Sequence, residues 1–90
     1  ARLTASRIRD GREEYYPEEL VAEIIAGANP VRTFREYRRL TASEVARQAG
    51  VNQSYISEIE NGRKPGSASA LKRIAQALRV EMELLISDDG

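Results

Sequence analysis

The chain of 90 residues contains no cysteine and no histidine. It therefore has no disulfide, no thiolate nucleophile, no imidazole acid or base, and none of the usual ligand sets for zinc. Its longest uninterrupted run of strongly apolar residues is Leu84-Leu85-Ile86, which is too short for a membrane span or for the core of a signal peptide. We expect a cytoplasmic protein with no cofactor, no metal and no membrane partner.

The charge of the chain is unevenly distributed, although 14 basic and 14 acidic residues give a net charge of zero. Residues 31–80 carry ten basic and four acidic side chains, whereas residues 1–30 carry four and six, and residues 81–90 carry four acids and no base. A basic middle segment is typical of a surface that binds a polyanion. Uneven scatter by chance over a small domain would give the same pattern, so charge alone leaves both interpretations open.

Apolar spacing and capping residues predict helices along most of the chain. Thr41 and Glu44 have the spacing of a capping box, Asn52 and Ser67 are good N-caps, and Gly50 can end a helix in the left-handed conformation. No segment alternates apolar and polar residues for long enough to predict a strand. The sequence therefore predicts an all-α fold with helices at 17–26, 31–39, 42–49, 53–60, 68–78 and 81–86.

Three segments follow from this pattern: an N-terminal arm and extra helix (1–30), a bundle (31–86) and an acidic tail (87–90). The chain begins at Ala1 rather than methionine, as a trimmed terminus would. Its first 14 residues end in a predicted turn at 10–14 and form either a frayed arm or the tail of a longer segment. One face of the extra helix is apolar, and it packs on the bundle or meets a protein partner. That face consists of Leu20, Val21, Ile24 and Ile25.

The two short helices at 42–49 and 53–60 have the spacing of a helix-turn-helix. Ala46 is small enough for the second helix to cross closely, Gly50 makes the sharp turn, and Ile56 fills the angle between the helices. In such a pair the second helix protrudes far enough to enter a major groove.

The second helix of this pair has one apolar and one polar side. At roughly 100° per residue, Ile56 and Ile59 point one way, and the polar residues fill an arc of about 140° on the other. Short amide and hydroxyl groups near the start of a helix can bond to base edges without filling the groove. An ordinary solvated face is the alternative for this helix taken alone. The polar arc consists of Gln53, Ser54, Ser57, Glu58 and Asn61.

Residues 31–86, with "REYRRLTASEVARQAGVNQSYISEIENGRKPGSASALKRIAQALRV", resemble the five-helix DNA-binding domain of the Cro/phage-repressor (XRE) helix-turn-helix family. The resemblance implies that double-stranded DNA is the partner. It also implies a structural pair between Arg35 and Glu60 that braces the reading helix. Ala42 departs from the pattern, because many members carry there a glutamine that anchors a phosphate. The positions that read bases would be Gln53, Ser54, Ser57 and Glu58.

Phosphate contacts would then come from basic residues around the reading helix and from the amides near Ser67, where a helix N-terminus can bind an anion. Such contacts make binding fall steeply with salt. A solvated, weakly paired side chain is the alternative for each of them. The candidates are Arg47, Arg63, Lys64, Ser67 and either Arg38 or Lys72.

The segment "YYPEELVAEIIAGANPVRTFREYRRLT" is similar to helix-turn-helix antitoxins of bacterial toxin–antitoxin operons, which place a short helix before the bundle. The resemblance implies that a protein toxin could be a further partner. Candidates for a self-association surface, with core burial as the alternative for the leucines, are Tyr15, Tyr16, Met82, Leu84 and Leu85.

The sequence is compatible with two function classes. The first is a sequence-specific transcriptional regulator, a repressor that reads the major groove as a homodimer, with antitoxin activity as a variant. The second is a protein-interaction module that does not touch DNA. An enzyme is not expected, because the glycines of the 62–66 segment lack phosphate-loop spacing and no carboxylate pair marks a site.

Overall fold

The computed structural model describes the backbone of residues 5–9 and the backbone and side chains of residues 15–86. Helices α3, α4 and α5 have the bounds that the sequence predicts, and the other helices agree within two residues at each end. The elements in chain order are β1 (Ala5–Arg9), β2 (Tyr15–Pro17), α1 (Glu18–Ile25), α2 (Pro30–Tyr37), α3 (Ala42–Ala49), α4 (Gln53–Glu60), α5 (Ala68–Leu78) and the 3₁₀ helix η1 (Met82–Leu85).

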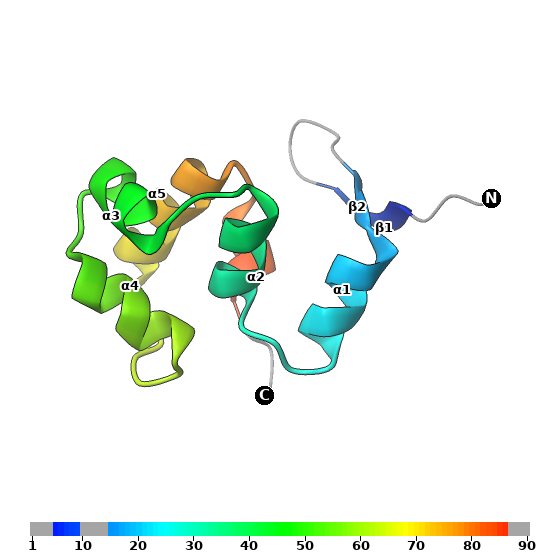
Figure 1. The fold of residues 1–90 in the computed structure, drawn as a ribbon, viewed down its shortest axis with the longest axis horizontal. Helices are drawn as coiled ribbons and strands as arrows, with labels where there is room; N and C mark the ends of the chain where they lie inside the picture. Colours follow the sequence, from blue (N-terminus) through cyan, green and yellow to red (C-terminus); the bar gives the residue numbers. More distant parts are fainter. Residues whose placement is uncertain (1–4, 10–14, 87–90) are drawn as a thin grey trace.

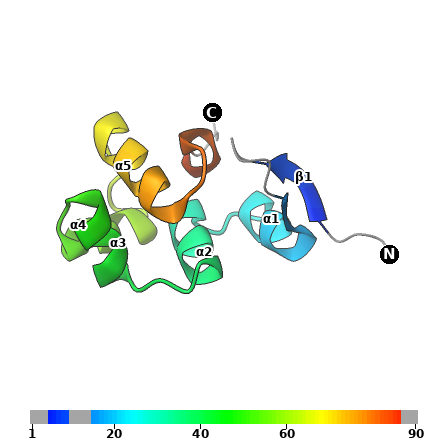
Figure 2. The ribbon, with the colours of Figure 1, turned by 90° about the horizontal axis from the view of Figure 1, so that it is seen from above.

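The bundle and the N-terminal elements lie at opposite ends of the molecule. In Figure 1 and Figure 2, α3 and α4 form one end, β1 and β2 belong to the other, and α2 lies between them. Helix α3 packs on α4 and α5, α2 packs on α4, α5 and η1, and α1 joins α2 to the strands. None of the described helices is long and apolar enough to cross a membrane.

The fold is all-α in its bundle, but the expectation that no segment forms a strand is wrong at the N-terminus. Strands β1 and β2 pair antiparallel, with Ala5 opposite Pro17 and Arg9 opposite Tyr15 and an irregularity between them. A three-residue strand is too short to show an alternating pattern, so the pairing was not visible in the sequence. The predicted turn at 10–14 and the acidic tail at 87–90 lie outside the described residues.

A cluster of aromatic rings fixes the N-terminal elements to the bundle. Tyr16 is fully buried, and its ring meets the rings of Phe34 and Tyr37 edge to face, with centroids 5.1 and 5.7 Å apart. Such pairs add about 0.5–1.5 kcal/mol beyond the burial of their area. Tyr16 is therefore a core residue rather than part of a self-association surface, whereas Tyr15 is 47% exposed.

The apolar face of α1 divides between core and solvent. Leu20 is buried and Val21 and Ile24 are partly buried against the core, but Ile25 is 80% exposed. Of the two alternatives for this face, packing on the bundle therefore holds for Leu20, Val21 and Ile24, and Ile25 is left outside that packing. This residue is the last of an eight-residue helix, where the chain turns toward α2.

The core of the bundle lies beneath the helix-turn-helix. Val45, Ile56, Ile74 and Leu78 are fully buried there. Burying a side chain of this size contributes roughly 1.5–3 kcal/mol relative to leaving it exposed. This core therefore fixes α3 and α4 against α5.

Local hydrogen bonds begin and end the helices of the bundle. Thr41 Oγ1 accepts from the Glu44 amide at 3.0 Å, and Glu44 Oε1 accepts from the Thr41 amide at 2.8 Å, so the predicted capping box is formed. Ser67 Oγ accepts from the Ala70 amide at 3.1 Å at the start of α5. Gly50 ends α3 with φ 73°, a conformation that a Cβ disfavours. These caps set the lengths of α3 and α5.

Candidate nucleic-acid interface

The crossing of α3 and α4 leaves the second helix at the edge of the molecule. Ala46 is 4% exposed and Ile56 is fully buried in the same core cluster, and α3 packs on α4, in agreement with the spacing of the two residues. Figure 1 shows α4 at the end of the molecule farthest from the strands, beside α3. No described element covers the outer side of α4.

The outer side of α4 carries short polar side chains. Gln53, Ser54 and Ser57 are exposed, whereas Ile59 on the opposite side is 4% exposed. The structure therefore brings three of the four predicted base-reading residues together on one open surface. The fourth, Glu58, lies on the same helix with its side chain 37% exposed, and it pairs with Lys64.

Arg35 braces the far end of α4. Its Nε and Nη2 donate to the two carboxylate oxygens of Glu60 at 2.7 and 3.2 Å, and its Nη1 donates to the Leu40 carbonyl at 2.9 Å. The two side chains are 17% and 9% exposed. The hydrogen bond to Glu60 raises the pKa of Arg35, although desolvation opposes it, so the guanidinium stays charged. This bidentate pair joins α2 to α4, where the resemblance places it.

The guanidinium of Arg38 is engaged by the end of α5. Its Nε donates to the Leu78 carbonyl at 2.7 Å and its Nη2 to the Arg79 carbonyl at 3.0 Å. Its guanidinium also lies over the rings of Tyr16 and Tyr37, at 5.8 and 5.3 Å from their centroids. The structure therefore corrects the assignment of Arg38 to the phosphate set, because its donors cap the last turn of α5 and hold the aromatic cluster.

The remaining phosphate candidates differ in what they already contact. Arg47, Arg63 and Lys72 are exposed, and within the described part of the chain they form no ion pair or side-chain hydrogen bond. Ser67 is more restricted, because its Oγ accepts from Ala70 and its own amide donates to Tyr55 Oη at 3.0 Å. Its hydroxyl proton is the donor left for an anion.

Lys64 is held against the outer side of α4. Its Nζ lies 3.3 Å from Glu58 Oε1 and 5.8 Å from the centroid of the Tyr55 ring. The amides of Arg63 and Lys64 both donate to the Glu58 carbonyl, at 2.8 and 3.3 Å. The basic loop and α4 therefore form one connected unit.

Two residues near this surface differ from what the sequence predicts. Asn52 stands at the N-cap position of α4, but its side chain makes no capping bond and is exposed beside Gln53. Asn52 therefore occupies the predicted N-cap position without the side-chain bond that a cap would make. Arg73 Nε donates to the Ala49 carbonyl at 3.0 Å and so fixes the end of α3 to α5. The partner of Arg73 is 24 residues distant, so no local signal marked this contact.

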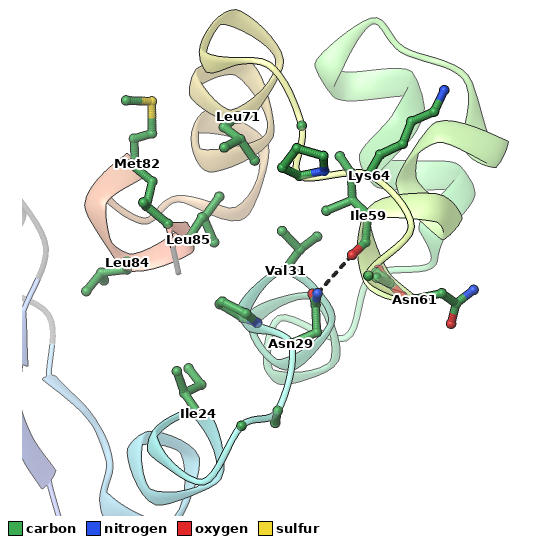
Figure 3. Close-up of a pocket in the computed structure, with 18 of the residues that line it drawn as sticks. Ile24, Asn29, Val31, Ile59, Asn61, Lys64, Leu71, Met82, Leu84 and Leu85 are labelled. Carbon is green, nitrogen blue, oxygen red and sulfur yellow. Dashed lines mark hydrogen bonds between the residues drawn. The ribbon is translucent and has the colours of Figure 1, made fainter. Parts of the chain in front are cut away.

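A pocket of about 1040 Å³ lies on another side of the bundle, lined by the end of α1, the start of α2, the 61–66 loop and η1. Figure 3 shows Ile24, Val31, Met82, Leu84 and Leu85 around it, with the Asn29 side chain donating to the Ile59 carbonyl at 2.9 Å. Lys64 extends from the loop away from the centre of this pocket.

Comparison with known proteins agrees with this geometry. The family model described as a helix-turn-helix domain matches residues 29–85. The HTH-type transcriptional repressor RghR of Bacillus subtilis is 39% identical over 62 residues, which are 67% of this chain and 45% of RghR. The chain thus spans about half the length of RghR, and 39% and 59% of two mycobacterial regulators that it also matches.

Two solved structures share the fold. The restriction-modification controller protein C.AhdI from Aeromonas hydrophila has a TM-score of 0.63 and 25% identity, covering 72% of this chain and 98% of that one. The biofilm master regulator SinR, in complex with DNA, has a TM-score of 0.61 and 28% identity, covering 66% and 98%. With the matched family model, these show that the chain belongs to the helix-turn-helix family of the Cro/phage-repressor (XRE) type.

Proposed function

We propose that the chain is the DNA-binding part of a transcriptional regulator and that α4 reads the major groove. The observation that carries this proposal is the exposed row of amide and hydroxyl groups on α4, whose opposite side packs on α3, with Ala46 and Ile56 buried in one core cluster. Such groups can bond to base edges, since each base pair presents its own pattern of donors and acceptors in the major groove. The proposed base-reading residues are Gln53, Ser54, Ser57 and Glu58.

Phosphate contacts would supply the part of the affinity that does not depend on sequence. Arg47 and Arg63 are the best placed, because both are exposed and their guanidinium groups have no partner among the described residues. Lys72, the Ser67 hydroxyl and Lys64, once its ammonium group leaves Glu58, complete the proposed set. Charged donors of this kind fix the position of a protein on the duplex and make its affinity fall with salt.

The proposed mechanism is repression by a homodimer. One small module buries too little surface for tight, specific binding, so two copies are expected on a pseudo-palindrome. Their α4 helices would enter adjacent major grooves about 34 Å apart and cover a promoter. RghR is named a repressor and SinR was solved in complex with DNA, which supports the proposal by similarity.

Selection of duplexes from a random pool, at a stated ionic strength, tests this function. A regulator of this kind should enrich one motif with two-fold symmetry, and titration with salt should weaken binding to it steeply. Weak binding that responds to neither salt nor sequence would refute the proposal and favour a protein-interaction module.

A second candidate is an antitoxin that binds DNA and also a protein toxin. The observation that favours it is Ile25, 80% exposed at the end of an extra helix outside the matched domain, which begins at residue 29. An Ile25→Ser variant should then lose co-purification with a co-expressed toxin, while its DNA affinity stays unchanged. If neighbouring genes encode no protein that co-purifies with the wild-type chain, this candidate fails.

A further inference from the structure

We propose that Glu58 lowers the affinity for non-specific DNA by holding the ammonium group of Lys64 against α4. The proposal rests on the function proposed above and adds a specificity-determining role that acts through a second side chain. In this proposal Glu58 positions Lys64 through its Oε1 atom. This role is separate from the base contact proposed above for the same side chain.

The geometry restrains Lys64 from three directions. Its Nζ lies 3.3 Å from Glu58 Oε1, its cation lies 5.8 Å from the centroid of the Tyr55 ring, and its amide donates to the Glu58 carbonyl at 3.3 Å. Tyr55 is fixed in turn, because its Oη accepts from the Ser67 amide at 3.0 Å. The ammonium group is therefore attached to the helix that would read bases, at both its side chain and its backbone.

The neighbouring cations show what this restraint removes. Arg47 and Arg63 are exposed without a partner in the described part of the chain, so both can neutralise a phosphate on any sequence. Lys64 can do so only by leaving Glu58 or by bringing that carboxylate toward the phosphates. Each phosphate neutralised adds about 0.9 to the slope of log affinity against log salt. The pair therefore withholds one such contribution from non-specific binding.

Simple repulsion between Glu58 and DNA would also lower affinity, so the two explanations must be separated. Repulsion acts whether or not Lys64 is present, whereas restraint requires its ammonium group. A double-mutant cycle of Glu58→Gln and Lys64→Met distinguishes them, because coupling between the two changes measures their interaction. Glu36→Gln on α2 is the matched control, since it removes the same charge from a carboxylate paired with Arg32, with the two side chains 58% and 59% exposed.

The experiment measures binding to a random-sequence duplex over a range of salt concentrations, with thermal melting to verify the fold of each variant. We expect Glu58→Gln to raise the salt slope by about 0.9. It should tighten binding at low salt by roughly two- to five-fold, the range of an exposed ion pair. In the Lys64→Met background the same change should have no effect on the slope. Glu36→Gln should leave the slope unchanged in both backgrounds.

An equal effect of Glu58→Gln in both backgrounds, or no effect in either, would overturn the proposal. Salt elution from heparin provides a second readout that does not depend on DNA recognition, and the cycle should give the same coupling there. If heparin gives that coupling while the duplex is not bound at all, the restraint stands and the proposed function fails. If the duplex is bound and neither polyanion gives coupling, the restraint fails and the proposed function stands.

Discussion

Five arginines of the described 31–80 segment fall into two groups that lie in different regions. On the α3–α4 side, Arg47 and Arg63 are exposed and have no partner in the described part of the chain. Where α2 and α5 meet their neighbours, Arg35, Arg38 and Arg73 donate to a carboxylate or to backbone carbonyls. The positive charge of residues 31–80 therefore has two uses. Arg35, Arg38 and Arg73 hold the fold together, and only the remaining cations are available to a polyanion.

Two of the arginines that donate to backbone carbonyls lie at helix ends, where carbonyls lack partners within the helix. Arg38 and Arg73 donate to carbonyls at the C-terminal ends of α5 and α3, where the last carbonyls of a helix lack partners and its dipole favours a cation. The planar guanidinium suits such sites, since it offers several donors in a fixed arrangement. The outward-facing arginines meet solvent in this structure, so their charge is available to a polyanion.

The largest effect should come from the most buried ion pair among the described residues. Arg35→Ala leaves the carboxylate of Glu60, whose side chain is 9% exposed, without its bidentate partner. We expect a loss of about 3–5 kcal/mol in the free energy of unfolding, measured by urea denaturation. Arg32→Ala is the control, because that arginine pairs with Glu36 at a surface where both side chains are more than half exposed. It should cost less than about 0.5 kcal/mol, and equal losses would show that the Arg35 pair is not structural.

A smaller effect, confined to one base pair, should follow Gln53→Ala. Gln53 is exposed at the first turn of α4, where a side chain would meet base edges. We expect a loss of about 1–3 kcal/mol in affinity for the selected operator and a relaxed preference at one position, measured with a panel of single-base variants. Gln76→Ala, at an exposed position on α5, should leave the panel unchanged. A uniform loss over all sequences would mean that α4 does not read bases through Gln53.

The sequence could predict the features that depend on neighbouring residues, but not those that depend on residues far apart in the chain. The capping box at Thr41 and the turn at Gly50 each depend on residues within a few positions of one another, so α3 and α4 were placed correctly. The partners of Arg38 lie 40 and 41 residues away, and no local pattern records them. Strand β2 has only three residues, which give no alternation to detect. Solvent exposure at Ile25 also depends on how α1 meets α2.

Arg38→Ala tests whether this arginine stabilises the fold or contacts a phosphate. The change removes two hydrogen bonds from a charged donor and its contacts with the rings of Tyr16 and Tyr37. Because the site is partly exposed, we expect a loss of about 1.5 kcal/mol in the free energy of unfolding, near the lower end for charged hydrogen bonds. The salt slope of DNA binding should stay the same. A slope reduced by about one would return Arg38 to the phosphate contacts.

Arg47→Ala is the converse test, with the smallest expected effect on the fold. Arg47 is exposed on α3 and has no partner in the described ranges, so its removal should change the free energy of unfolding by less than about 0.5 kcal/mol. If it neutralises a phosphate, the salt slope should fall by about 0.9 and every duplex should be bound more weakly by the same factor. Arg38→Ala and Arg47→Ala thus serve as controls for each other, because each should change the quantity that the other leaves alone. A variant of Arg47 that weakens the fold but not the slope would show that exposure in the free protein does not identify the DNA-binding cations.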